Sequence, residues 1–553
     1  MRLRASKNGL TVNIVAGTSA VLFSLHLDET KTKDLLGFYI HKKNLKKGTE
    51  YDIESIKYFE ETVPHPQPGA RYSTKIHPWQ SFLWEDFYVE HKGRYEYSFT
   101  PVYGTPSDLK YGKPVTVNLT IPSPKEDIHE VYFNRGVAGS QAYAREFGNR
   151  RPDEMEEAER VKALKWLSKG LKEALLNFIA LAKDNTYQLR CCFYEFEYEE
   201  VLSALNEARK KRKVDVKVIY DARGQKKKNT EAIESAGLPA SMLIPRTSDP
   251  KYIQHNKFMV LLKNKQPVAV FTGSTNITEK GIFGQCNTGH IIRDKSIAKK
   301  YLAYWTCLKD DPDNAATRAG CLNIQADIDE LEDGVTAFFS PRAKKKLLSL
   351  YSSIVSQSKQ LVCGMFPFSF NKEIKNAVVA DTDYLKYIII DKKTKNTSLQ
   401  SNDFDNVIIW GGVLDTPIYN WLDETHAGKL FKSGTNYIHN KVILIDPLSE
   451  APLVISGSAN FSDNSILHND ENTLAIKGNK NVADFYFTEF ARIFNHYSSR
   501  QDIKKFTKKN EEEGHNPNHL WTKSAEWVPS FYKPTALKHK RKKMFDGMKA
   551  ERV

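Results

Sequence analysis

The sequence predicts an α/β protein with two lobes related by a pseudo-twofold axis, preceded by an all-β sandwich domain. Three observations predict this fold class. A polar cassette occurs twice, with His255 and His439 separated by 184 residues. After residue 124, helical segments alternate with nearly continuous apolar runs, whereas residues 1–123 alternate apolar and polar positions. At 553 residues, the chain is also long for a single hydrophobic core.

Residues 1–123 are predicted to form the sandwich. Tyr95, Tyr97 and Phe99 alternate with polar residues, and residues 115–121 repeat that alternation before a Pro-Ser-Pro break. The Tyr-x-Tyr-x-Phe strand followed by Val-Tyr-Gly resembles an immunoglobulin or fibronectin type III module. Nearby aromatic residues are expected to fill the core rather than to form a binding surface: Trp79, Phe82, Trp84, Phe87 and Tyr88. The sandwich is also where a protein partner is expected to bind, if the chain has one.

The two predicted lobes cover residues 124–310 and 311–500. In the first, a helix over residues 154–182, a strand over 189–194, a helix over 198–211 and a strand over 214–221 form a βαβ unit. In the second, residues 343–358 and 361–366 repeat the helix and strand. Residues 337–340 echo 131–134, and residues 407–410 echo 216–220. An acidic helix around residues 327–333 is expected near the junction. This repetition indicates a duplicated module.

Residues 501–553 are predicted to be a polar, basic C-terminal tail. It ends in the run Lys538-His539-Lys540-Arg541-Lys542-Lys543. Such a run is most often a solvated terminus, and a nucleic-acid-binding arm is the alternative.

Composition indicates which class of partner the protein binds and which cellular compartment it suits. The net charge of +14 favours a polyanion, either nucleic acid or an anionic membrane surface, although a solubility role stays open. The six cysteines have no spacing typical of zinc ligands and suit a reducing compartment. We find no apolar run long enough to span a bilayer and no signal peptide, so a cytoplasmic protein is expected.

The cassettes bring the same functional groups to each lobe. His255 and Lys257 are two residues apart, as are His439 and Lys441, so on extended chain both side chains of a pair share one face. Each pair is followed by a Gly-Ser-x-Asn segment in which the Asn lies 21 residues after the His. These segments supply Ser274 and Asn276 in the first copy and Ser458 and Asn460 in the second.

Two imidazoles, two lysines and two asparagines around one cavity suit attack on a phosphodiester. The lysines and asparagines would bind the non-bridging oxygens, with the two serines as further substrate-binding residues. One imidazole would attack phosphorus and the other would protonate the departing oxygen. The ammonium groups would supply the charge that a divalent ion supplies elsewhere, so no metal and no cofactor are expected. Because both cassettes lie in one chain, the active site is expected to form within it.

His-x-Lys-x4-Asp followed by Gly-Ser-x-Asn, present twice, resembles the phospholipase D superfamily of phosphodiesterases. The resemblance covers roughly residues 125–530 and implies two α/β/α lobes, an active site at their interface and a covalent phosphohistidine. The second copy matches fully, and its Asp446 is expected to support the fold around the cassette. The first copy departs from the pattern, because Leu262 stands at the corresponding position.

The resemblance also implies a role for Glu471. In similar enzymes, a carboxylate at this position orients the histidine of the opposite lobe, so Glu471 is expected to pair with His255. A one-residue gap in the alignment sets Cys286 opposite Glu471, which would leave His439 without a carboxylate. His255 is therefore the expected nucleophile and His439 the expected general acid, with the reverse assignment left open.

Nucleic acid is the expected substrate, with DNA favoured over RNA. The basic segment beginning at Arg223 follows an apolar strand at the edge where α/β folds bind ligands, so Arg223 is expected to bind substrate. Two alternatives stay open. One is a phospholipase D-type lipid hydrolase, for which Gly411-Gly412-Val413-Leu414, Tyr419 and Trp421 are the candidate membrane loop. The other is a degenerate, non-catalytic nucleic-acid-binding protein.

Overall fold

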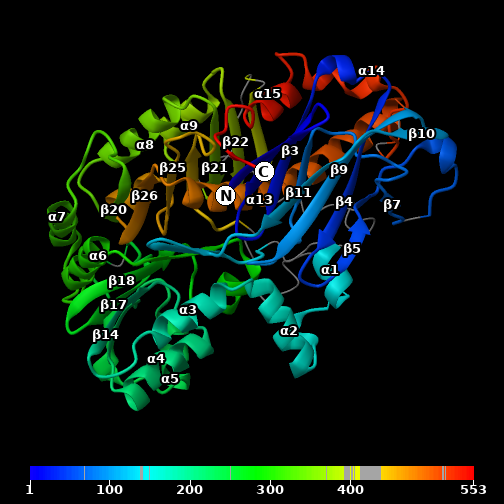
Figure 1. Cartoon of the computed structure of the whole chain (residues 1–553). Helices are drawn as coiled ribbons and strands as arrows, with labels where there is room; N and C mark the ends of the chain where they lie inside the picture. The colour runs from blue at the N-terminus through cyan, green and yellow to red at the C-terminus, as the bar shows by residue number, and fades with distance from the viewer. Residues whose placement is uncertain are drawn as a thin grey trace. The chain divides into compact units, whose positions relative to one another are not determined.

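Two compact units make up the computed structural model of the chain (Figure 1). The structure describes residues 1–553 except 68, 137–140, 149, 250, 369, 392–398, 400–402, 404, 412–437, 514, 515 and 517, and except the side chains of 141, 142 and 499–513. One unit comprises Met1–Ser123, Asp446–Pro452 and Ala483–Val553, and the other Pro124–Ile445 and Leu453–Val482. Both predicted lobes thus fall in the second unit, whereas residues 483–500, predicted to belong to the second lobe, fall in the first.

Two antiparallel sheets enclose one apolar core in the first unit. The first sheet has the order β27 (Glu551–Arg552), β1 (Arg2–Lys7), β2 (Leu10–Ala16), β3 (Val21–Leu27) and β8 (Leu83–Asp86), with only the β27–β1 pair parallel. The second has the order β10 (Asp108–Tyr111), β9 (Arg94–Thr105), β4 (Leu35–Asn44) and β5 (Thr49–Asp52), and β11 (Val115–Thr120) also pairs with β9. Phe82 and Trp84 are buried in the shared core, whereas Tyr88 is exposed. The predicted sandwich is therefore present.

The C-terminal segment is part of that sandwich. After α13 (Lys480–Glu513), the chain forms α14 (Ser524–Trp527) and α15 (Leu537–Lys543) and ends in β27. Trp527 and Phe531 lie in the sandwich core, and the buried Lys542 ammonium lies 3.8 Å from the centre of the Tyr532 ring. The expectation of a solvated terminus is thus wrong for this segment, because its aromatic residues complete the core.

The first lobe is built on a mixed sheet. Its order is β12 (Lys125–Glu126), β13 (His129–Phe133), β19 (Thr288–Ile292), β18 (Gln266–Gly273), β17 (Lys257–Lys263), β14 (Tyr187–Phe193), β15 (Asp215–Asp221) and β16 (Leu243–Arg246). β14, β15 and β16 are parallel, and the other pairs are antiparallel. The helices are α1 (Gln141–Phe147), α2 (Glu157–Ser168), α3 (Leu171–Ala180), α4 (Glu199–Arg212), α5 (Lys226–Ser235), α6 (Lys295–Leu308) and α7 (Asn314–Ile324).

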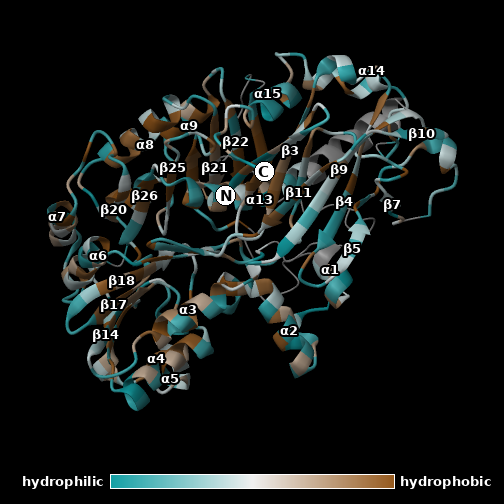
Figure 2. Ribbon diagram, viewed as in Figure 1, coloured by the Kyte–Doolittle hydropathy of each residue, from teal (hydrophilic) through white to brown (hydrophobic). Residues whose placement is uncertain are grey.

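The second lobe repeats the same sheet order. It reads β20 (Gly334–Ser340), β26 (Glu471–Lys477), β25 (Leu453–Gly457), β24 (Val442–Ile445), β21 (Leu361–Phe366), β22 (Leu385–Ile390) and β23 (Asn406–Trp410). The helices include α8 (Lys346–Ser356), α9 (Lys372–Val379) and α12 (Asp463–Leu467). Figure 2 shows strands of both lobe sheets, such as β17 and β25, in the brown of apolar residues, because both faces of each sheet are buried.

Three local predictions differ from the structure. β22, rather than residues 407–410, is the counterpart of β15, because β22 pairs in parallel with β21 as β15 does with β14. The long predicted helix divides into α2 and α3, because Lys169 and Gly170 have φ of 49° and 96°, outside the right-handed helical range. Residues 327–333 form no helix, since a loop leads from α7 to β20.

The two lobes share a core. One apolar cluster joins Cys192 and Phe258 of the first lobe to Phe339 and Leu474 of the second. Leu262, which replaces the expected Asp, lies in this cluster on β17 and is 3% exposed. None of the described helices is long and apolar enough to cross a membrane.

Candidate active site

Both histidines stand just before a central strand, and each is held by the opposite lobe. His255 precedes β17, and its backbone N–H donates to the carbonyl of Asp470 over 2.9 Å. His439 precedes β24, and its N–H donates to the carbonyl of Cys286 over 3.2 Å. Cross-lobe bridges between Gln254 and Asp470 and between Cys286 and Ile438 accompany these bonds. The backbone therefore sets the relative position of the two cassettes.

A carboxylate at the end of a parallel strand fixes each histidine from within its own lobe. Asp221, the last residue of β15, accepts from the N–H of Gln254 over 3.1 Å. Asp391, directly after β22, accepts from the N–H of Ile438 over 3.0 Å. The two lobes therefore make the same backbone N–H to carboxylate contact at equivalent positions.

Glu471 lies beside His255. The His255 Nδ1 is 2.9 Å from the Glu471 Oε2, and the Ser458 hydroxyl donates to the same oxygen over 2.9 Å. Because an ionised carboxylate only accepts hydrogen bonds, Nδ1 carries the proton and Nε2 keeps its lone pair. Burial raises the pKa of Glu471 to about 7. Burial lowers the pKa of His255 well below its usual value, and nearby lysines lower it further.

His439 has an amide where His255 has a carboxylate. Its Nδ1 lies 2.9 Å from the Asn287 Oδ1 and 3.1 Å from the Ser274 carbonyl oxygen. The Ser274 hydroxyl donates to Asn287 over 2.8 Å, as Ser458 does to Glu471. Asn287, not Cys286, is therefore the counterpart of Glu471, which corrects the gapped alignment. Among the described residues, the His439 Nδ1 thus contacts an amide where the His255 Nδ1 contacts a carboxylate.

The two lysines are buried and carry lowered pKa values. The Lys257 ammonium donates to the His255 carbonyl over 2.5 Å, and the Lys441 ammonium to the His439 carbonyl over 2.7 Å. Burial lowers the pKa of Lys257 to about 8. Burial and the neighbouring Lys257 hold the pKa of Lys441 well below its usual value. An anion between the lysines would stabilise their charged forms.

Both imidazoles line one cavity of about 290 Å³. Of the residues predicted from the Gly-Ser-x-Asn segments, Asn276 and Asn460 line it, whereas Ser274 and Ser458 are fully buried and hold Asn287 and Glu471. Six further lining residues were not predicted: Tyr194, Glu195, Ile253, Lys280, Gln285 and Phe368. Glu195 stands out among them, because the Asn276 amide donates a hydrogen bond to its carboxylate.

The middle asparagine of each cassette joins the lobes. Asn256 accepts from the Asn472 amide over 2.9 Å. Asn440 accepts from the Thr288 hydroxyl over 2.8 Å and from the Ser274 hydroxyl over 3.1 Å. Constant His-Asn-Lys spacing in both copies was the sequence signal for this role.

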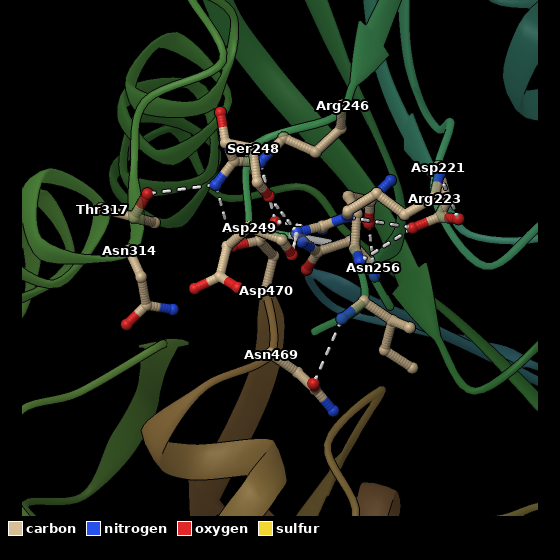
Figure 3. A network of polar contacts seen from close by, with 12 residues as sticks. Asp221, Arg223, Arg246, Ser248, Asp249, Asn256, Asn314, Thr317, Asn469 and Asp470 are labelled. Carbon is tan, nitrogen blue, oxygen red and sulfur yellow. Dashed lines mark hydrogen bonds and ion pairs between the residues drawn. The ribbon is translucent and has the colours of Figure 1, made fainter. Parts of the chain in front are cut away.

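Arg223 lies in a buried ionic network rather than in the cavity (Figure 3). Its guanidinium donates to Asp470 over 3.2 Å and to the Asp249 carbonyl over 3.1 Å, and its side chain is 5% exposed. Arg246 donates to the same Asp470 carboxylate over 2.9 Å and also to Asp311. Arg223 as a substrate-binding residue stays a prediction.

Other predicted positions lie away from the cavity or outside the described residues. Asp446 directly follows β24, five residues after Lys441, and its φ of 45° marks a turn. Tyr437 of the second cassette and residues 412–421 of the candidate membrane loop lie outside the described residues. Within the described part of the chain, no three His, Cys, Asp or Glu side chains converge as a metal site.

Residues 175–306 and 355–494 match the family model described as "Cardiolipin synthase, PLD-like domain". The first range falls on the first lobe, and the second falls on the second lobe except for residues 446–452 and 483–494, which belong to the other unit. No curated protein is similar enough to match.

Several solved structures match part of this chain. Phosphatidylserine synthase from Haemophilus influenzae is 14% identical over 63% of this chain and 92% of that one, with a TM-score of 0.40. Polyphosphate kinase from Porphyromonas gingivalis is 12% identical over 57% of this chain, with a TM-score of 0.37, and the match spans only 46% of the kinase. Nuc from Salmonella typhimurium, a phospholipase D family member, is 29% identical over 24% of this chain and 84% of Nuc, with a TM-score of 0.21.

Proposed function

Because this chain belongs to the phospholipase D superfamily, with both phospholipase D-like lobes in one polypeptide, we propose that it is a metal-independent phosphodiesterase that cleaves nucleic acid through a covalent phosphohistidine. One observation carries the proposal. His255 and His439 line the same cavity, but a carboxylate holds one and an amide holds the other. This asymmetry suits a nucleophile and a general acid.

The phosphodiester anion would bind between the two lysines. Lys257, Lys441 and the Asn460 amide would contact its non-bridging oxygens, where charge grows in the transition state. Bringing a negative charge into this buried site raises the pKa values of Lys441 and His439, which burial and neighbouring lysine charges hold low. Substrate binding therefore favours the protonated form of His439, the general acid that must donate a proton to the departing oxygen.

His255 would attack first. Its Nε2 lone pair forms the N–P bond while the P–O bond to the departing group breaks, and His439 gives its proton to that oxygen. Glu471 stabilises the positive charge that develops on His255. A water molecule, deprotonated by His439, then breaks the N–P bond and regenerates both histidines.

Nucleic acid is the proposed substrate, with DNA ahead of RNA. The net charge of +14 supports a polyanionic substrate, because Lys and Arg that neutralise phosphates supply most non-specific affinity for nucleic acid. The basic run from Lys226 to Lys228 opens α5, next to Arg223, in the same lobe as His255. It adds local positive charge to that lobe.

Cleavage in the presence of a chelator tests the proposal. We expect the wild type to cut single-stranded DNA, plasmid or RNA in excess EDTA, and His255→Ala and His439→Ala each to lose this activity. Release of phosphatidic acid from phosphatidylcholine, with nucleic acid left intact, would identify a lipid hydrolase instead. Loss of cleavage on adding EDTA would contradict the mechanism, and inertness towards all substrates would indicate a non-catalytic protein.

A further inference from the structure

The cavity lining differs in chemistry at equivalent positions of the two lobes, and its parts from each lobe are called here the first-lobe end and the second-lobe end. In the first lobe, Phe193 pairs with Lys257, and Glu195 follows two residues later. In the second lobe, Met365 pairs with Val442, so Phe366 stands opposite Lys441 and Phe368 follows two residues later. Glu195 and Phe368 both line the cavity. The duplicated fold thus presents a carboxylate at one end and an aromatic ring at the other.

The first-lobe end has more hydrogen-bond acceptors than the second-lobe end, where the Asn460 Oδ1 is the buried acceptor without a partner among the described residues. Glu195 is 8% exposed, and its carboxylate accepts from the Asn276 amide nitrogen, which turns the Asn276 Oδ1 away from it. The Asn276 Oδ1 and the Gln285 Oε1 are buried without a hydrogen-bond partner among the described residues. Lys280, half-buried, is the cation that lines the same end.

Unpaired buried acceptors are costly unless a ligand satisfies them. A buried carbonyl oxygen that loses its water needs a donor, and native structures leave few such groups unpaired. A carboxylate next to a phosphate site is also unfavourable by charge, unless it accepts hydrogen bonds from the substrate. Three acceptors at one end of the cavity therefore call for a substrate group that carries several O–H or N–H donors.

We propose that Glu195, Asn276 and Gln285 form a subsite for a nucleoside that donates hydrogen bonds through its hydroxyl or base N–H groups. The inference rests on the proposed function. The ring centre of Tyr194, the residue before Glu195, lies 4.9 Å from that of His255, so the subsite takes the nucleoside that stays esterified to the phosphoryl group on His255. Glu195 is then a specificity-determining residue for the retained side of the scissile bond.

Chromogenic esters with a common leaving group test this subsite. Thymidine 5′-(p-nitrophenyl phosphate) retains a nucleoside with donors, bis(p-nitrophenyl) phosphate retains a group with none, and p-nitrophenyl phosphorylcholine retains a cation without O–H or N–H groups. All three release p-nitrophenolate, so their kcat/KM ratios compare only the retained group. We expect the wild type to prefer the thymidine ester over the other two by at least tenfold.

Variants of the lining residues then show which side chains produce the preference for the thymidine ester. Glu195→Ala and Gln285→Leu should each reduce the preference ratio at least fivefold, and Glu195→Gln, which keeps an acceptor oxygen and the bond to Asn276, should reduce it less. Glu197→Gln is the matched control, because this carboxylate lies on the same segment but does not line the cavity. Gln285→Leu keeps the test valid if Glu195→Ala does not fold.

Each possible outcome supports or overturns the proposed subsite. An active wild type whose ratio is unchanged in Glu195→Ala, Glu195→Gln and Gln285→Leu would overturn the subsite while leaving the proposed function standing. A preference for the phosphorylcholine ester would also overturn it, because charge rather than hydrogen-bond donation would then govern selection. A wild type that hydrolyses none of the esters and no nucleic acid would refute the proposed function and the subsite together.

Discussion

Exchanging the groups that hold the two histidines should exchange their roles. Glu471 and Asn287 stand at equivalent positions, each 2.9 Å from an imidazole Nδ1 and each contacted by the serine of its own lobe. Glu471→Gln makes the two surroundings alike. Adding Asn287→Asp then places the single carboxylate beside His439.

The expected size of the effect follows from the charge that develops on the nucleophile. Two unit charges about 4 Å apart interact by about 4 kcal/mol at an effective dielectric constant of about 20. Because about 1.4 kcal/mol corresponds to a tenfold change in rate, Glu471→Gln should lower kcat by about two to three orders of magnitude. The double variant should recover a substantial part of that loss.

The position of the trapped phosphoryl group is the readout. A single-stranded oligonucleotide is mixed with enzyme above the pKa of Glu471, and the reaction is quenched in alkali, in which phosphohistidine survives. Peptide mass spectrometry should find the adduct on His255 in the wild type and on His439 in the double variant. An adduct on His255 in both proteins, or on His439 in the wild type, would refute the assignment of roles from the carboxylate.

Three further predictions concern pH, the ionic network and the sandwich. At saturating substrate, where the bound anion keeps His439 protonated, kcat should rise with pH as Glu471 ionises, from about pH 7 upward; a Glu471→Gln profile that keeps this acid limb would contradict the role of Glu471. Asp470→Asn removes the buried carboxylate that Arg223 and Arg246 share, so urea denaturation should show a loss of about 3–5 kcal/mol in the free energy of unfolding, whereas an unchanged midpoint would show that this carboxylate is not stabilising. Trp527→Ala should cost the sandwich about 3–5 kcal/mol; a loss under about 1 kcal/mol would mean that this segment is not part of the core.

The sequence could predict the features that depend on repetition and periodicity. Identical offsets identified both cassettes and therefore two lobes, and the period-two runs identified the sandwich. The same constant offset of 184 residues pairs Asn287 with Glu471 without any gap. An alignment that inserts a one-residue gap to match Thr288 with Thr473 places Cys286 opposite Glu471 instead. That alignment favours matching residue types over constant spacing.

Features that depend on tertiary contact could not be predicted in this way. Glu195 follows an apolar strand in an acidic segment and has Phe368 as its counterpart, so repetition gives no signal for it. Arg223 belongs to a basic run that indicates a solvent-exposed loop, yet Asp221 and Asp470, far apart in sequence, draw its guanidinium inside. The aromatic residues after position 520 are too sparse for periodicity to reveal that they fill a core.

The pairing of β27 with β1 has a consequence for folding during translation. A ribosome releases the first residues of the sandwich long before it synthesises Trp527, Phe531 and β27, which complete the core and the sheet edge. The emerging sandwich therefore keeps apolar surface uncovered until those residues are synthesised. Both lobes can fold during that interval, because their strands come from residues 124–482. A premature stop near residue 500 would thus leave the lobe strands intact but give a chain prone to aggregate through its N-terminal domain.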